Sequence, residues 1–182
     1  MNYQAAEDPA LVAATRSGDI EAFETLVRRH TRVVYAHALR FFGDPSTAED
    51  VTQEVFVKVY RSLDGFDERS RFTTWLFRVT RNTCLDEVRS GKRRPIPVDP
   101  LDSPPVIQED FSDEVALSAS VDHAMRGLPP EDRDALAAVA LFGLSYAEAS
   151  DALGVPVGTV KSRVFRARRS MAATLNLSAG GA

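Results

Sequence analysis

Apolar residues recur at helical spacing along most of the chain, and the clearest case is the segment from residue 155 to residue 171. At ~100° per residue, one stripe of this segment is entirely apolar; it consists of Val157, Val160, Val164, Ala167 and Met171. The opposite side is polar and basic, and it holds Thr159, Lys161, Ser162, Phe165, Arg166 and Arg169. The pattern predicts an amphipathic helix that packs through one stripe and presents a basic face with an exposed aromatic ring.

A shorter helix is predicted directly before this one. Ser145 is a suitable N-cap, and Glu148 three residues later completes a capping box. Gly154 supplies the left-handed turn that ends the short helix, and Pro156 fits the first turn of the next helix. Two helices joined by so tight a turn, the second of them basic, are typical of a helix-turn-helix whose recognition helix comes last.

The basic face suits a DNA major groove, where arginine reaches guanine edges and phenylalanine meets thymine methyl groups. The alternative is a solvated basic face that binds nothing.

The N-terminal half is also predicted to be helical. Asp19 caps a long helix that runs to about Phe42, and residues 43–46 interrupt the pattern. A second helix is predicted to start at Ser46, where Glu49 completes another capping box. The positions that these two helices should bury are Ile20, Phe23, Leu26, Val27, Val34, Ala38, Phe41, Ala48, Val51, Val55 and Val59. The outer face of the second helix holds Asp50, Gln53, Glu54, Val57 and Arg61.

Residues 63–71 are too polar to continue this helix, and a further helix is predicted from about Phe72 to Ser90. That helix has two apolar stripes, so we expect neighbours to contact it from two sides. Its remaining sector brings together Trp75, Arg78 and Asn82, a combination that suits a platform for unstacked bases. The alternative is that Trp75 is an ordinary core residue.

Composition bounds the number of domains and the choice of partner. The chain has 182 residues, of which 44% are hydrophobic, enough for one or two small globular domains. Its net charge of −4 is unevenly spread, because the segment from Ile96 to Asp122 contains seven acidic residues and no basic one. An acidic protein binds bulk DNA weakly, since phosphate neutralisation supplies most non-specific affinity. This favours a module that a larger partner delivers to DNA.

The proline-rich acidic stretch cannot fill a core and predicts an extended linker. We therefore expect an all-α protein made of two small helical domains, residues 8–95 and residues 114–177, joined by a linker over residues 96–113.

Other classes of protein are disfavoured by what the sequence lacks. Cys84 is the only cysteine and the three histidines are scattered, so neither a disulfide nor a zinc site is expected. The N-terminus lacks the basic and apolar regions of a signal peptide, and no apolar run could span a membrane, so a cytoplasmic protein is expected. There is no glycine-rich phosphate loop, metal cluster or nucleophile paired with histidine, so we expect no enzyme and no cofactor.

Three motifs in order along the chain resemble those of extracytoplasmic-function (ECF, group 4) sigma factors, which are bacterial transcription initiation factors of the sigma-70 family. The matching segments are AEDVTQEVF at residues 48–56, FTTWLFRVTRN at residues 72–82, and the segment from residue 144 to residue 163. The run LPPEDR at residues 128–133 also matches the usual entry to the second domain.

The resemblance implies a role for each surface of the chain. Core RNA polymerase, at the clamp helices of its largest subunit, would be bound by Asp50, Gln53, Glu54 and Phe56. The minus-ten promoter element would be opened, and a base of its non-template strand captured, by Phe66, Arg69, Ser70, Arg71, Trp75, Arg78 and Asn82. The adjoining duplex phosphates would be contacted by Arg89, Lys92, Arg93 and Arg94. The minus-thirty-five element would be read by Thr159, Lys161, Ser162, Arg163, Phe165, Arg166 and Arg169.

The same resemblance implies two further partners: the flap of the second large polymerase subunit and an anti-sigma factor that holds the chain inactive. Two alternatives stay open at this point, a helix-turn-helix regulator that is not a polymerase subunit and a pure interaction adaptor.

Overall fold

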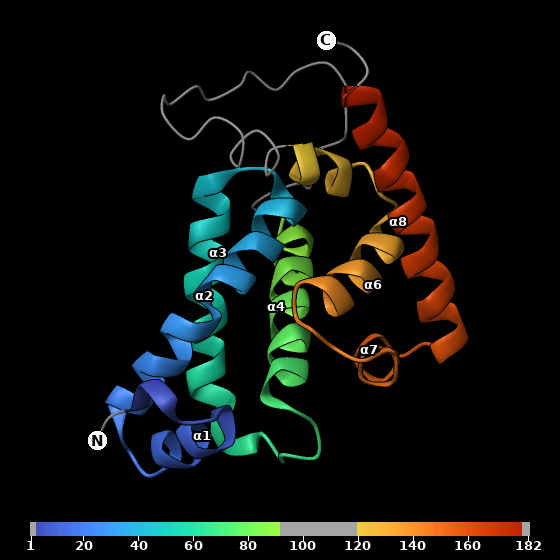
Figure 1. The fold of residues 1–182 in the computed structure, drawn as a ribbon. Coiled ribbons are helices and arrows are strands. Elements are labelled where there is room, and N and C mark those ends of the chain that lie inside the picture. The colour runs from blue at the N-terminus through green and yellow to red at the C-terminus, as the bar shows by residue number, and fades with distance from the viewer. Residues whose placement is uncertain (1–2, 92–119, 180–182) are drawn as a thin grey trace.

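The computed structural model describes residues 3–91 and 120–179, and the regular structure in those two ranges is helical throughout (Figure 1). The elements of the first range are η1 (Tyr3–Ala5), α1 (Asp8–Arg16), α2 (Ile20–Phe42), α3 (Pro45–Ser62), η2 (Leu63–Gly65) and α4 (Phe72–Arg89). In the second range residues 120–126 are helical, and α6 (Pro130–Ala140), α7 (Tyr146–Leu153) and α8 (Val157–Ala179) follow. The predicted all-α fold is therefore confirmed, while the predicted linker at residues 96–113 lies outside the described residues.

Helices α1 to α4 pack around one apolar core. Leu11 of α1, Leu26 of α2, Val55 of α3 and Leu76 of α4 are all completely buried in it. The carboxylate of Asp19 accepts hydrogen bonds from two backbone N–H groups of α2, and this confirms the predicted N-cap. α4 begins at Phe72 as predicted and ends at Arg89.

Two local expectations for this half were wrong, and one helix was not predicted. α3 begins at Pro45 rather than Ser46, because Asp44 caps it by accepting from the Thr47 N–H at 2.7 Å and proline suits the first helical position. Ile20 lies at the start of α2 with 63% of its surface exposed, although its spacing predicted a core residue. The helix that was not predicted from the sequence is α1, a nine-residue helix that buries Leu11 and Val12.

The second half forms the predicted helix-turn-helix. Ser145 accepts from the Glu148 N–H while the Glu148 carboxylate accepts from the Ser145 N–H, which is the expected capping box. Gly154 ends α7 in the left-handed region at φ 66°. Val160, Val164 and Ala167 of α8 are buried against α6 and α7, as predicted. Val157, by contrast, is 37% exposed, because it lies at the first turn of α8, before the helix reaches the core.

The two halves pack against each other through α4, which lies between the α2–α3 pair and the α6–α7 pair in Figure 1. The ring of Phe142, just after α6, contacts both Phe77 of α4 at 5.2 Å and His37 of α2 at 5.8 Å between centroids. Arg81 of α4 pairs with Asp134 of α6 at 2.5 Å. These contacts confirm the expectation that neighbouring helices pack against α4 on two sides.

Cys84 lies on α4 and is fully buried, and this burial raises the pKa of its thiol above the ordinary range. The helices in the described parts of the chain are too short or too polar to cross a membrane.

Candidate nucleic-acid interface

The outer face of α8 is open to solvent. Lys161, Ser162 and Arg169 are exposed, and Phe165 has 67% of its surface exposed, the largest fraction of any large apolar residue described. Thr159 and Arg163 are half-buried at the margins of this face. A protruding ring set among cations and a hydroxyl is the arrangement that the helical pattern predicted.

Arg166 is the one residue of this face that a carboxylate holds from another helix in the described structure. Its Nε and Nη2 donate to the two carboxylate oxygens of Asp132 at 3.0 and 2.6 Å, so the pair is bidentate. These hydrogen bonds raise the pKa of Arg166. The Asp132 side chain is only 5% exposed, whereas 55% of the Arg166 side chain remains exposed. Asp132 therefore fixes the guanidinium at the surface without covering it.

The loop before α4 is built on three aromatic rings. Phe66 is 5% exposed; its ring stacks on Trp75 at 5.1 Å between centroids and meets Phe72 edge-on at 6.2 Å. Trp75 is half-buried as a result. The structure thus places Phe66 beneath the loop, and the polar residues Arg69 and Ser70 lie on its outer side.

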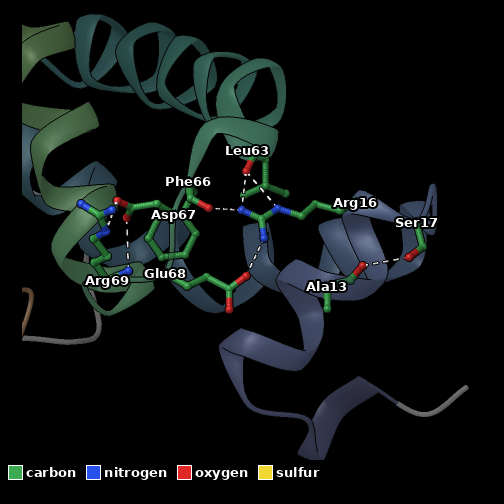
Figure 2. Close-up of polar contacts among 8 residues, drawn as sticks. All are labelled: Ala13, Arg16, Ser17, Leu63, Phe66, Asp67, Glu68 and Arg69. Carbon is green, nitrogen blue, oxygen red and sulfur yellow. Dashed lines mark hydrogen bonds and ion pairs between the residues drawn. The ribbon is translucent and has the colours of Figure 1, made fainter.

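A cavity of about 310 Å³ opens beside this loop. Its lining consists of Pro9, Phe66, Glu68, Arg69, Ser70, Arg71 and Phe72. Asp67 orders the rim, because its carboxylate accepts from the Arg69 backbone N–H at 3.2 Å and pairs with the Arg69 Nε at 3.3 Å (Figure 2). Four of the residues expected at the minus-ten element therefore line one hollow.

Arg71 reaches from this loop to the second half of the chain. Its Nη2 donates to the carbonyl oxygen of Gly143 at 2.8 Å and to Glu148 Oε2 at 2.7 Å, while its Nε donates to Glu148 Oε1 at 2.5 Å. The Arg71 guanidinium is the main reason that the pKa of Glu148 is lowered to about 2. Glu148 thus serves both as the capping carboxylate of α7 and as the partner of a loop residue.

The other residues expected near the minus-ten element lie farther along α4. Arg78 is half-buried, and Asn82 and Arg89 are exposed. Lys92, Arg93 and Arg94 lie outside the described residues.

Two apolar grooves lie away from these surfaces. The larger, about 660 Å³, runs between α2 and α3, and its lining consists of Ile20, Phe23, Val27, Thr31, Thr52, Gln53, Phe56, Val57, Tyr60 and Arg61. Asp50 and Glu54 are exposed on α3, whereas Phe56 is 7% exposed in the groove wall. The smaller, about 350 Å³, is lined by Arg40, Val121, Met125, Leu136, Ala140, Leu141, Arg168, Met171, Ala172 and Leu175.

Comparison with known proteins decides the family. Residues 26–94 match Sigma-70 region 2, and residues 118–171 match Sigma-70 region 4. The chain is 34% identical over 177 residues to the RNA polymerase sigma-H factor of Pseudomonas aeruginosa, across 91% of this chain and 92% of that one. It is 35% identical over 178 residues to the ECF RNA polymerase sigma-E factor of Escherichia coli, across 90% and 92% of the two chains. This chain is an ECF sigma factor of the sigma-70 family.

The fold of this sigma factor is also found in solved structures. CnrH in complex with the cytosolic domain of CnrY is 30% identical and superposes with a TM-score of 0.70, across 93% of this chain and 97% of CnrH. RpoE from Bartonella quintana, in complex with the anti-sigma factor NepR, superposes with a TM-score of 0.66 at 23% identity, across 85% of this chain and 96% of RpoE.

Membership of this family confirms the predicted function class. A sigma factor directs RNA polymerase to promoters and is not an enzyme, so the reading as an independent regulator or an adaptor is excluded. The α2–α3 groove, whose lining includes the apolar residues Ile20, Phe23 and Tyr60, was not predicted from the sequence. The signal available in the sequence was Val57, an apolar residue on the otherwise polar outer face of α3.

Proposed function

We propose that this sigma factor divides promoter recognition between two surfaces. The outer face of α8 reads the minus-thirty-five element as duplex, and the loop before α4, with its cavity, captures a base of the minus-ten non-template strand. The observation that carries the proposal is the open α8 face, where an aromatic ring that is 67% exposed lies among cationic side chains. In this reading residues 8–95 hold the downstream site, residues 114–177 hold the upstream site, and residues 96–113 connect them.

On α8 the chemistry is direct readout of base edges. The guanidinium of Arg166 is oriented by Asp132, so it meets a guanine edge with little further loss of side-chain freedom. Phe165 supplies apolar contact for a thymine methyl group. Lys161 and Arg169 lie beside them, where cationic side chains contact phosphates and fix the register on the duplex.

At the loop the chemistry is capture of an extruded base. Taking a base out of the stack costs a few kcal/mol, and a pocket that stacks and hydrogen-bonds the base offsets that cost. The cavity beside the loop combines aromatic walls with the polar groups of Arg69 and Ser70. Promoter opening then needs no hydrolysis by this chain, because binding to the separated strand shifts the equilibrium.

We propose that the α2–α3 groove binds the polymerase clamp helices. It is apolar, its lining includes Gln53, and the exposed polar residues Asp50 and Glu54 lie near Gln53 along α3, which suits a core-and-rim protein interface. The smaller groove beside α8 is the seat we propose for the flap. RpoE, which has the same fold, was solved with the anti-sigma factor NepR, and CnrH was solved with the cytosolic domain of CnrY. We therefore also infer an anti-sigma partner for this chain, acting in the cytoplasm with the polymerase.

The test begins with core polymerase and promoters that the reconstituted holoenzyme selects from a random library. Phe165→Ala removes an exposed ring, and we expect it to abolish promoter-specific transcripts while the chain still co-elutes with core polymerase. Val57→Asp in the α2–α3 groove changes a residue that is 47% exposed, and we expect it to lose co-elution with core polymerase and, with it, promoter-specific transcripts. Arg166→Ala should also abolish promoter-specific transcripts, but it leaves the buried carboxylate of Asp132 without its partner. It is therefore compared with the double variant Arg166→Ala/Asp132→Asn, which removes that unpaired charge. Equal loss of both activities in Phe165→Ala would overturn the assignment of α8.

A further inference from the structure

The guanidinium of Arg16, the last residue of α1, lies against the loop that follows α3 (Figure 2). Its Nε and Nη2 donate to the carbonyl oxygen of Leu63 at 3.1 and 3.0 Å. Nη2 also donates to the carbonyl oxygen of Phe66, and Nη1 pairs with Glu68 Oε1 at 2.5 Å. One side chain thus holds three points along six residues of the loop, from a distance of 47 to 52 positions in the sequence.

Only arginine presents donors in this arrangement. The planar guanidinium has five N–H groups in a fixed fork, whereas lysine carries a single compact charge on a flexible stem. The Arg16 side chain is 25% exposed, and its Cζ lies 5.9 Å from the centroid of the Phe66 ring. Hydrogen bonds from a charged donor to carbonyl oxygens in such a partly buried place are stronger than neutral ones.

The loop needs such a restraint because its backbone is strained at the far end. Glu68 has φ 58° and is the one non-glycine residue with positive φ in the part of the chain that the structure describes. A residue held in that region costs on the order of 1–3 kcal/mol and persists only where its surroundings over-determine it. Arg16 pairs with the carboxylate of Glu68 and bonds two carbonyl groups earlier in the loop, so it supplies that constraint.

The same helix also forms part of the cavity. Pro9 at the start of α1 lines the hollow beside the loop. Asp8 ties this end of α1 to α2, because its carboxylate pairs with Arg29 at 2.5 Å and with His30 at 2.9 Å. α1 is therefore fixed to the helical core at one end and holds the loop at the other.

We propose that Arg16 is a positioning residue for recognition of the minus-ten strand, which fixes the backbone of residues 63–68 in the shape that makes the base cavity. Base specificity at the minus-ten element then depends on α1, a helix that is separate in the sequence from both the loop and α4. The inference rests on the proposed role of the loop and adds the residue that sets its geometry.

The test measures discrimination rather than binding alone. The probe is a promoter fork with duplex upstream DNA and a single-stranded minus-ten segment, carrying either the library-selected sequence or a scrambled one. For holoenzyme with Arg16→Ala we expect the ratio of the two affinities to fall about tenfold, which corresponds to about 1.4 kcal/mol of base-specific contact, because the cavity loses the shape that fits the selected base. Affinity for the scrambled fork and for core polymerase should stay at the wild-type level.

Three further variants and a stability measurement separate positioning from general stability. Arg32→Ala, at an exposed arginine of α2, is the matched control and should keep the wild-type ratio. Arg16→Lys should recover only part of the discrimination, because it restores charge without the fork. Glu68→Gly removes the ion pair but suits positive φ, so it should keep most of the ratio if the carbonyl contacts dominate. Thermal unfolding of each variant shows whether it remains folded.

The outcomes are distinct. Equal loss of affinity for both forks in Arg16→Ala, or a wild-type ratio in that variant, overturns the role of Arg16. Failure of the wild-type holoenzyme to distinguish the two forks overturns the proposed function of the loop itself.

Discussion

The two surfaces proposed to read DNA hold their side chains in opposite ways. On α8 the aromatic residue Phe165 protrudes into solvent and makes no ring contact within the described structure. At the loop before α4 the aromatic residues face inward, with Phe66 buried under the loop and Trp75 stacked against it. The cations differ too, since Arg166 is held within its own half of the chain whereas Arg71 is bound to Glu148 of the other half.

In the proposed function the two surfaces meet DNA in different states, and this accounts for the difference. A duplex groove has a fixed outline, so its reader needs side chains that already stand out from a rigid helix. An extruded base needs a hollow, so the aromatic residues at that surface form walls and support. On α8 the aromatic residue proposed to bind DNA does not stabilise the fold, whereas at the loop the aromatic residues do both.

The largest expected effect tests this separation. Trp75→Ala removes the ring that supports both Phe66 and Phe72, and we expect the free energy of unfolding to fall by about 3 kcal/mol, the low end for a tryptophan that is only half-buried. Phe165→Ala should change it by less than about 0.5 kcal/mol, as for exposed sites elsewhere. Urea unfolding of the two variants measures both values, and similar losses would contradict the comparison.

A pH-dependent effect of similar size concerns the contact between the two halves. His37 is 2% exposed among Phe41, Phe77 and Phe142, its Nε2 has no hydrogen-bond partner, and burial lowers its pKa to about 4. The unfolded chain takes up this proton near pH 6.5 and the folded chain only near pH 4. The contribution of neutral His37 to the free energy of unfolding is therefore fully present above about pH 6.5. The free energy of unfolding falls by about 3 kcal/mol as the pH drops toward 4.

Urea unfolding between pH 7 and pH 4 measures this loss, and His37→Phe should abolish most of it because the substituted ring does not titrate. His123→Gln, at an exposed histidine, is the matched control. If the free energy of unfolding depends on pH in the same way in His37→Phe, then the imidazole of His37 is not the cause of the pH dependence.

The smallest expected effect concerns the ion pair that joins the loop to α7. Glu148→Gln removes the charge but keeps a capping side chain, and Arg71 is 55% exposed, so the loss should stay below about 1 kcal/mol at pH 7. Since the pKa of Glu148 is lowered to about 2, the contribution of the pair is present above about pH 4.5 and is lost between there and about pH 2.

A double-mutant cycle with Arg71→Gln and Glu148→Gln isolates the coupling, and the matched single control is Glu131→Gln on the exposed side of α6. A coupling of about 2 kcal/mol or more would show that the second half locks the loop, which is beyond what an exposed pair supplies.

Features set by neighbouring residues were predictable from the sequence, and features set by distant ones were not. The capping box of α7, the left-handed Gly154 and the start of α4 depend on a few adjacent positions, and all three were predicted correctly. The start of α3 was predicted wrongly, because Asp44 and Ser46 are both good capping residues two positions apart and the structure uses Asp44 instead of the predicted Ser46.

The site itself was predicted as a set of residues but not as a geometry. The partner of Arg71 lies 77 positions away and that of Arg166 lies 34 positions away, and helical periodicity carries no information on either choice. Arg16 was missed for the same reason, because its contacts exist only once α1 lies beside the end of α3. The roles of these residues at the promoter stay predictions until the experiments above are done.

The buried Cys84 has a consequence for how this protein can be observed. The thiolate is the reactive form of cysteine, and it is both shielded and disfavoured here because burial raises the pKa of the thiol. A thiol reagent therefore modifies the native chain only during the intervals when α4 separates from its neighbours. As the chain contains no other cysteine, the rate of modification of the unlabelled protein measures how often that opening occurs.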